Sequence, residues 1–442
     1  MMMTEHRIVE RPSSSRKGWY VVGLCMVAYI FSFIDRQILS LLIAPIQADL
    51  NIRDTEFALL HGLAFSIFYA TAGLPIAGLA DRMSRPFIIS VGIAVWSAAT
   101  MLCGLAGSFL HLFAARVGVG AGEAALSPAT YSLISDLFPR ERLGRAIAVY
   151  SLGSFAGAGI AFIVGSSVIA AVGASDAWAI GGLMLKPWQL TFLLVGLPGL
   201  FLALIVAATV RDPRRAALGA SSLADAPPFS AVLRTLWQHR AIFGPHMLGY
   251  SLAAMSLFTL LGWSPAFLMR GFAMAPQQAG YVLGAIAVVA GGGGVLASGT
   301  LMDWLAARGR SDAPFLTGVI GAIGVVPAII LMASTDSAAS AAVFLGVALF
   351  FASFPMPPSS ALMQIVPPRP MRSRVSAIFL FCNSLGGLTI GSVLVGALND
   401  HIFGPRNMGL SLAIVIGGAA ALAAIILSRG MRPFRQFMAA TA

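Results

Sequence analysis

Four ionisable side chains lie deep within long apolar stretches of the sequence. Asp35 is followed directly by Arg36, and Arg116 stands seven residues before Glu123. Seven residues of α-helix return to nearly the same face about 10 Å further along the axis, so Arg116 and Glu123 can line one stripe. A charged side chain at the centre of a bilayer costs roughly 2.5–3.5 kcal/mol by insertion scales, so such residues usually face a cavity or a partner.

Two acids and two guanidiniums can act together as a proton switch. Burial disfavours an ionised carboxylate and a neighbouring guanidinium favours it, so small rearrangements of the helices can move a proton on or off. The set is neutral when both carboxylates are ionised and carries +1 when either is protonated. We therefore predict proton coupling at Asp35 and Glu123, with Asp35 facing the cavity more directly than Arg36. Arg36 and Arg116 are predicted to attract an anionic group, and a purely structural ion-pair network is the alternative.

The composition indicates that the elements holding these charges are membrane helices. Of the 442 residues 58% are hydrophobic and only 10% are charged, which is too apolar for a water-soluble globule. Three isolated cysteines predict neither a disulfide framework nor a metal cluster, and no cofactor is expected. With about 20 residues needed to cross the hydrocarbon, the apolar runs predict twelve spans near 19–48, 57–80, 87–106, 109–134, 145–172, 188–210, 241–269, 278–303, 313–335, 338–364, 373–398 and 408–429.

The positions of Lys and Arg predict the orientation of the helices. With both termini in the cytoplasm, most basic residues fall on cytoplasmic segments, and only Arg53, Lys186, Arg270 and Arg406 fall on the opposite side. The net charge of +11 therefore indicates topology and contact with anionic lipid headgroups, and it does not indicate nucleic-acid binding. We expect a monomer in the plasma (inner) membrane.

Internal matches relate the two halves of the chain. Asp81 aligns with Asp303 at a shift of 222 residues, and Pro128 aligns with Pro357 at a shift of 229. FPRERLGRAI, after the fourth run, likewise matches PPRPMRSRVS after the tenth. Paired halves are how many transporters build a site at the membrane midplane. The predicted parts are a tail (1–18), a six-helix bundle (19–210), a cytoplasmic linker (211–240), a second six-helix bundle (241–429) and a tail (430–442).

The linker contains one amphipathic stretch. Apolar residues recur at helical spacing from Phe229 to Trp237, with Arg234 and Gln238 among them. This pattern predicts a short helix lying on the cytoplasmic membrane surface, and a disordered linker is the alternative.

Several motifs resemble those of the major facilitator superfamily. ADRMSR, after the second run, resembles its loop signature, and RVGVGAGEAALSPA resembles its Arg-containing fourth helix. Together with FIDR and SDLFPRERLGRA, the pattern is similar to the spinster branch, whose members move lysolipids and phosphorylated sphingoid bases. The resemblance implies an all-α membrane protein with twelve transmembrane helices in two pseudo-symmetric six-helix bundles. The chain departs from the loop signature at Ala77, Ser84 and Pro86, where Gly, Gly and a basic residue are usual.

The loop signature and one proline cluster are candidate gates. Asp81 can pair with Arg82, Arg85 or Arg145 and so latch the cytoplasmic side, a role that the resemblance also implies; a solvated surface pair is the alternative. PMPPSS, which contains Pro357, removes backbone donors and should kink the tenth span, so it is a second candidate gate.

The helix bodies of the C-terminal half carry no charge and offer an apolar wall. We predict that Trp263, Phe354 and Asn383 contact the substrate there, and we place His61 and His246 near helix ends at the interface. A charged half facing an apolar half suits an amphipath with an anionic head.

The sequence thus predicts a secondary transporter rather than an enzyme. It would couple protons to the movement of an amphipathic, lysolipid-like anion by alternating access. Two alternatives stay open: a transporter of another organic anion or drug-like amphipath, and a non-transporting membrane receptor or sensor.

Overall fold

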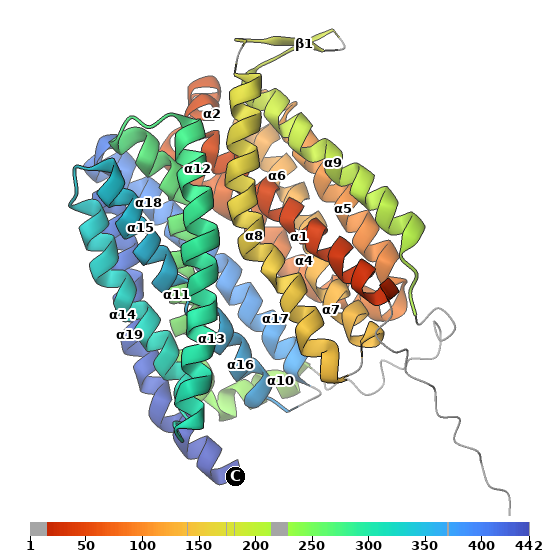
Figure 1. The fold of residues 1–442 in the computed structure, drawn as a ribbon, viewed down its shortest axis with the longest axis vertical. Coiled ribbons are helices and arrows are strands. Elements are labelled where there is room, and N and C mark those ends of the chain that lie inside the picture. Colours follow the sequence, from red (N-terminus) through yellow and green to blue (C-terminus); the bar gives the residue numbers. More distant parts are fainter. Residues whose placement is uncertain are drawn as a thin grey trace, which may run out of the picture.

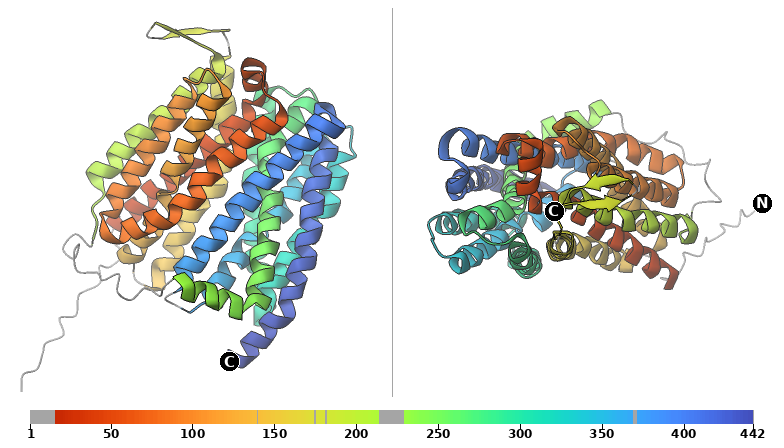
Figure 2. Two further views of the ribbon diagram at one scale, coloured as in Figure 1. Left: turned by 180° about the vertical axis from the view of Figure 1, so that it is seen from behind. Right: turned by 90° about the horizontal axis from the view of Figure 1, so that it is seen from above.

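The computed structural model describes residues 16–138, 140–173, 175–180, 182–213, 229–368 and 371–441. Within these residues the fold is almost entirely helical, and most helices run side by side along one long direction (Figure 1). Seen from above, the helices up to α9 and those from α10 onward form two neighbouring groups (Figure 2), which we call the N-terminal and C-terminal halves.

The N-terminal half contains nine α-helices, a π-helical turn and a small hairpin among the described residues. Its helices are α1 (Arg16–Leu41), α2 (Ile43–Leu50), α3 (Asp54–Ala58), the π-helix η1 (Leu59–Leu63), α4 (Ala64–Arg82), α5 (Arg85–Cys103), α6 (Phe109–Glu123), α7 (Leu126–Leu137), α8 (Arg140–Val172) and α9 (Pro187–Thr209). Strands β1 (Trp178–Ile180) and β2 (Leu183–Leu185) pair antiparallel between α8 and α9, around a turn in which Gly182 has φ of 83°.

The described residues of the C-terminal half form helices joined by short turns and loops. Its elements are α10 (Phe229–Gln238), α11 (Arg240–Gly271), α12 (Pro276–Ile286), the π-helix η3 (Ala287–Gly291), α13 (Gly292–Ala307), α14 (Ala313–Ala333), α15 (Ala338–Ala352), α16 (Met356–Ile365), α17 (Arg372–Asn383), the π-helices η5 (Ser384–Ile390) and η6 (Asn399–Phe403) around α18 (Gly391–Leu398), the 3₁₀-helix η7 (Pro405–Asn407) and α19 (Met408–Thr441).

The helices fit a membrane in length and surface. Eleven helical stretches of the described chain are long and apolar enough to cross a bilayer, and η1 with α4 supplies the remaining predicted crossing. Apolar side chains also cover much of the outside: Leu110, Val289 and Leu296 are 70%, 74% and 67% exposed. Such a surface is unfavourable in water and suits contact with lipid. The twelve-helix fold predicted from the sequence is confirmed.

Two helix breaks occur at corresponding places in the two halves. The fourth crossing breaks after Glu123 and resumes at Leu126, and the tenth breaks after Ala352 and resumes at Met356. Proline lacks the backbone N–H that would continue the helix, so PMPPSS produces the predicted interruption. The break after Glu123 places this acid at the end of α6, in the middle of its crossing.

The two ends of the bundle differ in what they carry. The β1–β2 hairpin marks one end, which we call the hairpin face, and α10 lies at the other, the α10 face (Figure 1). The helix predicted around residues 229–237 is present as α10. Val232 is fully buried against the C-terminal half, whereas Leu233 and Trp237 are 49% and 71% exposed, and the Arg240 guanidinium lies 5.4 Å from the Trp237 ring centroid.

Candidate functional site

A buried ion pair between α1 and α6 forms the centre of the site. The Arg36 Nε group donates to Glu123 Oε2 at 2.7 Å, and Arg36 Nη2 also pairs with this oxygen. Ser32 stands four residues before Arg36, on the same face of α1, and its hydroxyl donates to Glu123 Oε2 at 2.7 Å. Glu123 is 2% exposed, and its other oxygen, Oε1, is buried without a hydrogen-bond partner.

Aromatic rings surround the Arg36 guanidinium. Its central carbon lies 4.5 Å from the ring centroid of Phe65, 5.1 Å from that of Tyr69 and 5.2 Å from that of Phe33. A guanidinium over a ring face gains about 0.5–2 kcal/mol, depending on its desolvation. The three rings and Glu123 therefore hold this charge at a fixed position.

Close contact between α4 and α6 lets Phe65 reach these charges. A Cβ atom at Gly120 would lie 2.1 Å from the Phe65 carbonyl oxygen, so only glycine permits this approach. The Arg116 guanidinium consequently lies 5.7 Å from the Phe65 ring centroid, on the same side of α4 as Arg36. The predicted stripe on the fourth crossing is thus brought next to α1 and α4.

Asp35 occupies a different place from the one predicted. It is 3% exposed, and among the described side chains its carboxylate makes no ion pair. Arg116 Nη1 donates to the Asp35 backbone oxygen at 3.2 Å and not to its carboxylate. The prediction that Asp35 faces the cavity more directly is wrong: neighbours on a helix point about 100° apart, and Arg36 takes the face toward α6 and the cavity.

A small cavity between the two halves lies beside this pair. The N-terminal half lines most of it, and α11 and η5 close it with two apolar side chains. The lining residues are Phe33, Arg36, Gln37, His61, Phe65, Arg116, Phe258 and Leu388. Three polar atoms of these residues are buried without a partner, namely Gln37 Oε1, His61 Nδ1 and Arg116 Nε. Each unsatisfied buried group costs about 1–3 kcal/mol, so these three atoms mark a polar part of the cavity with unused hydrogen-bonding capacity.

The two histidines are buried rather than interfacial. His61 is 6% exposed and lines the cavity, because the π-helical turn η1 directs it toward α11. His246 is 1% exposed, and its Nε2 lies 3.0 Å from the Ser359 carbonyl oxygen, so it connects α11 to α16. Neither Gln37 nor His61 was predicted as a site residue. An uncharged polar residue in an apolar run is common, and no spacing distinguishes these two.

The predicted substrate contacts of the C-terminal half do not line this cavity. Trp263 is 2% exposed and its ring centroid lies 6.1 Å from that of Phe57 in α3. Phe354 is 4% exposed and packs against Phe350 and Phe351. Asn383 is partly exposed, with Oδ1 buried and unpartnered, but it too lies outside the cavity lining. Helix neighbours fill the faces on which Trp263 and Phe354 lie.

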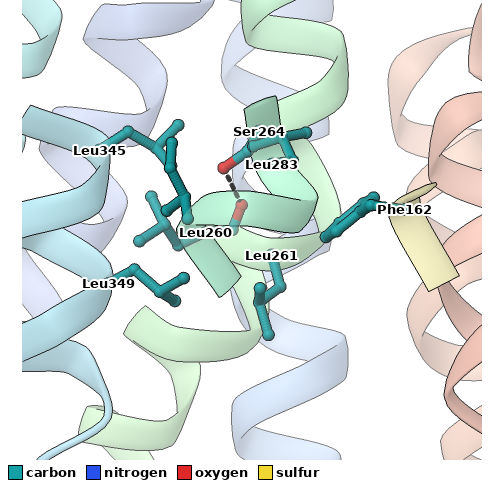
Figure 3. Close-up of a pocket in the computed structure, with 8 residues that line it drawn as sticks. Phe162, Leu260, Leu261, Ser264, Leu283, Leu345 and Leu349 are labelled. Carbon is teal, nitrogen blue, oxygen red and sulfur yellow. Dashed lines mark hydrogen bonds between the residues drawn. The ribbon is translucent and has the colours of Figure 1, made fainter. Parts of the chain in front are cut away.

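A second small cavity is apolar. It is lined mainly by leucines of α11, α12 and α15 together with Phe162 of α8 (Figure 3). Its single hydroxyl, from Ser264, donates back to the Leu260 carbonyl within α11. The cavity therefore presents hydrocarbon and no charge.

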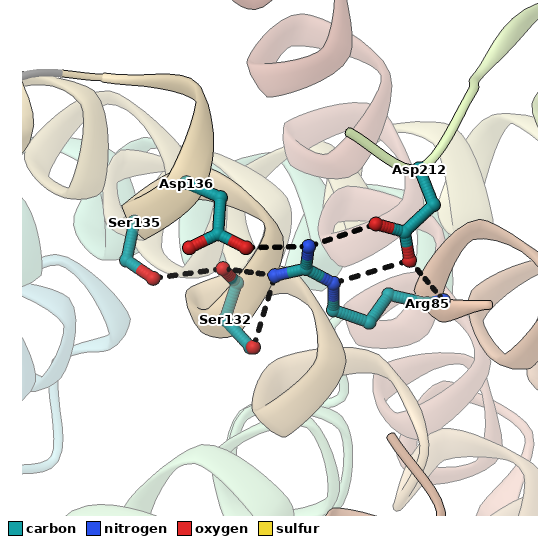
Figure 4. A network of polar contacts seen from close by, with 5 residues as sticks. All are labelled: Arg85, Ser132, Ser135, Asp136 and Asp212. Carbon is teal, nitrogen blue, oxygen red and sulfur yellow. Dashed lines mark hydrogen bonds and ion pairs between the residues drawn. The ribbon is translucent and has the colours of Figure 1, made fainter. Parts of the chain in front are cut away.

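Arg85 forms a saturated network at the α10 face (Figure 4). Its Nη2 donates to Asp136 Oδ2 at 2.6 Å and to Asp212 Oδ1 at 2.8 Å, and its Nε donates to Asp212 Oδ2 at 3.3 Å. Its Nη1 donates to the carbonyl and hydroxyl oxygens of Ser132 at 2.6 and 3.1 Å. All five N–H groups of Arg85 therefore have partners in α7 or in the segment after α9.

The other candidate gates are less connected. The Arg145 guanidinium lies 5.8 Å from the Trp19 ring centroid, again inside the N-terminal half. Pro357 lies in the first turn of α16, directly after the helix break. The side chains of Asp81 and Arg82 lie outside the described part of the structure.

An ion pair at the hairpin face joins the two halves. Arg270 at the end of α11 donates to both oxygens of Asp54 in α3, at 2.7 and 2.9 Å, and to Gln47 Oε1 at 2.6 Å. Asn399 Nδ2 also donates to Asp54 Oδ2 at 3.0 Å. Burial alone would raise the pKa of Asp54, but the hydrogen bonds and charge of Arg270 outweigh it and hold that pKa below the usual range.

Asp400 makes a second contact between the halves at the hairpin face, where it caps the start of α3. Its carboxylate accepts hydrogen bonds from the backbone N–H groups of Asp54 and Thr55 at 3.1 and 2.8 Å, and from the Thr55 hydroxyl at 2.6 Å. A carboxylate from the C-terminal half thus caps the start of α3 in the N-terminal half. We call Asp54, Arg270, Asn399 and Asp400 the hairpin-face latch.

The family follows from these features and from a direct comparison. Residues 25–390 match the sequence pattern that defines the Major Facilitator Superfamily, and the chain therefore belongs to this family. It is therefore a multi-pass integral membrane protein and a transporter rather than an enzyme. The family assignment agrees with the paired helix breaks and with the site between the halves.

Individual relatives place it near the spinster branch. It is 28% identical to an MFS-type efflux pump of Mycolicibacterium smegmatis over 93% of this chain and 92% of the relative. It is 26% identical to protein spinster of Drosophila melanogaster over 94% of this chain and 69% of the relative. It is 25% identical to a probable L-galactonate transporter of Escherichia coli over 92% of this chain and 88% of the relative.

A solved structure supports the same placement. A bacterial homolog of the human lysosomal transporter spinster, in an inward-facing and unoccupied conformation, superposes with a TM-score of 0.81 at 25% identity, over 96% of this chain and 98% of that one. The chain is thus a Major Facilitator Superfamily transporter that resembles the spinster branch.

Proposed function

We propose that this protein is a proton-coupled transporter of an anionic amphipath, such as a lysophospholipid or a sphingoid phosphate, and that it works by alternating access. The observation that carries the proposal is the Arg36–Glu123 pair, buried beside a cavity whose opposite wall is apolar. Both residues of the pair belong to one half, so the pair can stay intact while the halves move.

The pair can exchange a proton for an anion. Glu123 Oε2 takes the hydrogen bonds from Arg36 and Ser32, and its buried Oε1 is the atom available for a proton. Protonation removes the counter-charge of Arg36, and the site then carries a net positive charge that attracts an anionic headgroup. Arg116 Nε offers a second donor to that group. Asp35, which is 3% exposed and makes no ion pair with a described side chain, is the second proposed proton carrier.

The hydrophobic part of the substrate would lie against the C-terminal half. Phe258 and Leu388 close the cavity there, and the second cavity, beside Leu260 and Phe162, is lined by hydrocarbon. This arrangement and the spinster relatives favour a lipid-like cargo. The resemblance to a probable L-galactonate transporter favours a second candidate, a hydroxylated organic acid that uses the same guanidiniums.

We assign the α10 face to the cytoplasm. Arg16, Lys17, Arg234 and Arg240 lie there, and basic residues gather on the cytoplasmic side of membrane proteins. Leu233 and Trp237 of α10 are placed to enter the lipid interface beside anionic headgroups. Both termini would then be cytoplasmic, in the plasma (inner) membrane.

Uptake driven by an imposed pH gradient tests this function. Purified protein in liposomes is supplied with labelled lysophospholipid, sphingoid phosphate or galactonate, with and without the gradient. We expect the gradient to drive lipid accumulation, and Arg116→Leu to reduce it, while the exposed Asp336→Asn serves as a matched control. Gradient-driven uptake of galactonate alone would select the second candidate, and ligand binding without any flux would indicate a receptor.

A further inference from the structure

Gln37 and His61 are the uncharged polar residues that line the cavity beside the Arg36–Glu123 pair, which we call the central cavity. Both are nearly fully buried, at 5% and 6% exposure, and both line it together with the guanidiniums of Arg36 and Arg116. Gln37 Oε1 and His61 Nδ1 have no hydrogen-bond partner. The sequence gives no reason to single out either residue, and the ion pair with Glu123 does not use them.

Packing fixes the His61 ring in place. A Cβ atom at Gly262 of α11 would lie 2.7 Å from His61 Cε1 and 3.2 Å from its Nδ1, so the ring packs directly against a glycine. The next residue, Gly62, is equally constrained, because a Cβ there would lie 2.7 Å from the Leu388 carbonyl oxygen. The π-helical turn η1 is thus held between α11 and η5, and π-helical turns are frequent at functional sites.

The cavity contains both hydrogen-bond donors and hydrogen-bond acceptors. Guanidiniums only donate hydrogen bonds, so Arg36 and Arg116 suit the anionic oxygens of a ligand. Gln37 Oε1 only accepts, and a neutral imidazole accepts at one nitrogen and donates at the other. A ligand that satisfies the whole cavity must therefore bring a hydrogen-bond donor as well as an anionic group.

We propose that Gln37 and His61 form a neutral hydrogen-bonding subsite that selects a headgroup combining an anionic phosphate with its own N–H or O–H donor, such as phosphoethanolamine. A phosphocholine headgroup carries no N–H or O–H and therefore offers no donor to the Gln37 carbonyl. This inference rests on the proposed function and deepens it, because it names the headgroup chemistry of the same site.

Binding of two lysolipids with the same acyl chain tests the subsite. Equilibrium binding of lysophosphatidylethanolamine and lysophosphatidylcholine is measured on the full chain in lipid nanodiscs, with galactonate as a third probe. We expect the wild type to prefer the ethanolamine headgroup about tenfold, the change that the loss of one buried hydrogen bond produces. Gln37→Met keeps the side-chain length and should abolish the preference without weakening lysophosphatidylcholine.

His61→Gln provides the matched comparison for the imidazole. It retains a donor and an acceptor and should keep most of the preference, whereas His61→Phe should lose it. Each variant is accepted only if its melting temperature and its elution in gel filtration match the wild type. If a variant fails this check, Gln37→Leu or His61→Leu replaces it.

The outcomes separate the subsite from the lipid cargo. Equal affinity of the wild type for both headgroups would overturn the subsite. A preference that survives both Gln37→Met and His61→Phe would also overturn it, because the preference would then be steric. Binding of galactonate alone, lost in Gln37→Met, would refute the lipid cargo and keep the subsite. Binding of none of the three probes would overturn both.

Discussion

Arg36 and Glu123 pair inside the N-terminal half, whereas Asp54 pairs with Arg270 across the two halves. Both pairs join a guanidinium to a buried carboxylate, yet their positions demand different behaviour. The first can persist in every arrangement of the halves, because both partners move together. The second has to break whenever the hairpin face opens. In the proposed mechanism, location relative to the boundary between the halves, rather than residue type, therefore distinguishes the binding pair from the latch.

Arg85 is a third buried arginine for comparison, to which we assign neither substrate binding nor closure of the hairpin face. It is fully buried, and its partners Ser132, Asp136 and Asp212 all belong to the N-terminal half and line neither described cavity. We assign it a purely structural role, which holds α5 against α7 and the segment after α9. We thus assign three different roles to the networks of Arg36, Arg270 and Arg85.

The largest effect on stability is expected from Arg85→Leu. This substitution removes the buried guanidinium that pairs with Asp136 and Asp212, and removing one partner of a buried ion pair costs about 3–5 kcal/mol. Thermal unfolding in detergent should show a markedly lower melting temperature, while Arg145→Leu, which loses one contact with Trp19, should change it little. Equal effects of the two substitutions would contradict the structural role of the network.

Asp54→Asn should weaken the hairpin-face latch by about 1–3 kcal/mol, because the charge-assisted bonds from Arg270 are lost. Spin labels at the exposed positions 53 and 406, one in each half, report the separation at this face. We expect a new population at longer distance in Asp54→Asn and none in Glu123→Gln. A distance distribution that Asp54→Asn leaves unchanged would show that the latch does not hold the face closed.

Tyr69→Leu should have a smaller effect at the central pair. It removes one of three rings around Arg36, a loss of about 0.5–1 kcal/mol. Substrate affinity should therefore fall two- to fivefold without a change in the spacing at the hairpin face. A change in the spacing instead would mean that the ring supports the closure rather than the binding pair.

The smallest effect is expected from pH on the latch. The pKa of Asp54 is lowered in the closed state, so the stabilisation of that state is complete above the usual carboxyl range and is lost only as pH falls through the lowered value. Label distances at positions 53 and 406 should stay constant between about pH 5 and pH 8. A shift within that range would assign pH sensitivity to the latch instead of the central pair.

The sequence predicted the fold and part of the site for identifiable reasons. Charges such as Arg36 and Glu123 are costly in lipid, so their presence alone marks them. His61 was placed at the interface because its burial depends on a π-helical turn and on Gly262, which the sequence pattern does not reveal. Asp54 and Arg270 are 216 residues apart, and no periodicity connects them.

Other predictions rested on residue type or on proximity in sequence. Trp263 and Phe354 were assigned to the substrate from residue type; in the structure they pack against neighbouring helices and do not line the cavity, so their contact with a substrate stays a prediction. Arg85 was assigned to Asp81 from proximity in sequence, whereas Asp136 and Asp212 reach it through the fold. The faces that uncharged helices present, and contacts across the fold, could not be inferred from the chain alone.

Proton movement through the central pair is the most direct test of this account. A pH-sensitive dye inside proteoliposomes reports protons when a lysophospholipid or a sphingoid phosphate is added to the wild type, to Glu123→Gln or to Asp336→Asn. The account predicts a lipid-dependent pH change in the wild type and Asp336→Asn, and none in Glu123→Gln. Lipid movement without a pH change in the wild type, or an undiminished signal in Glu123→Gln, would contradict it.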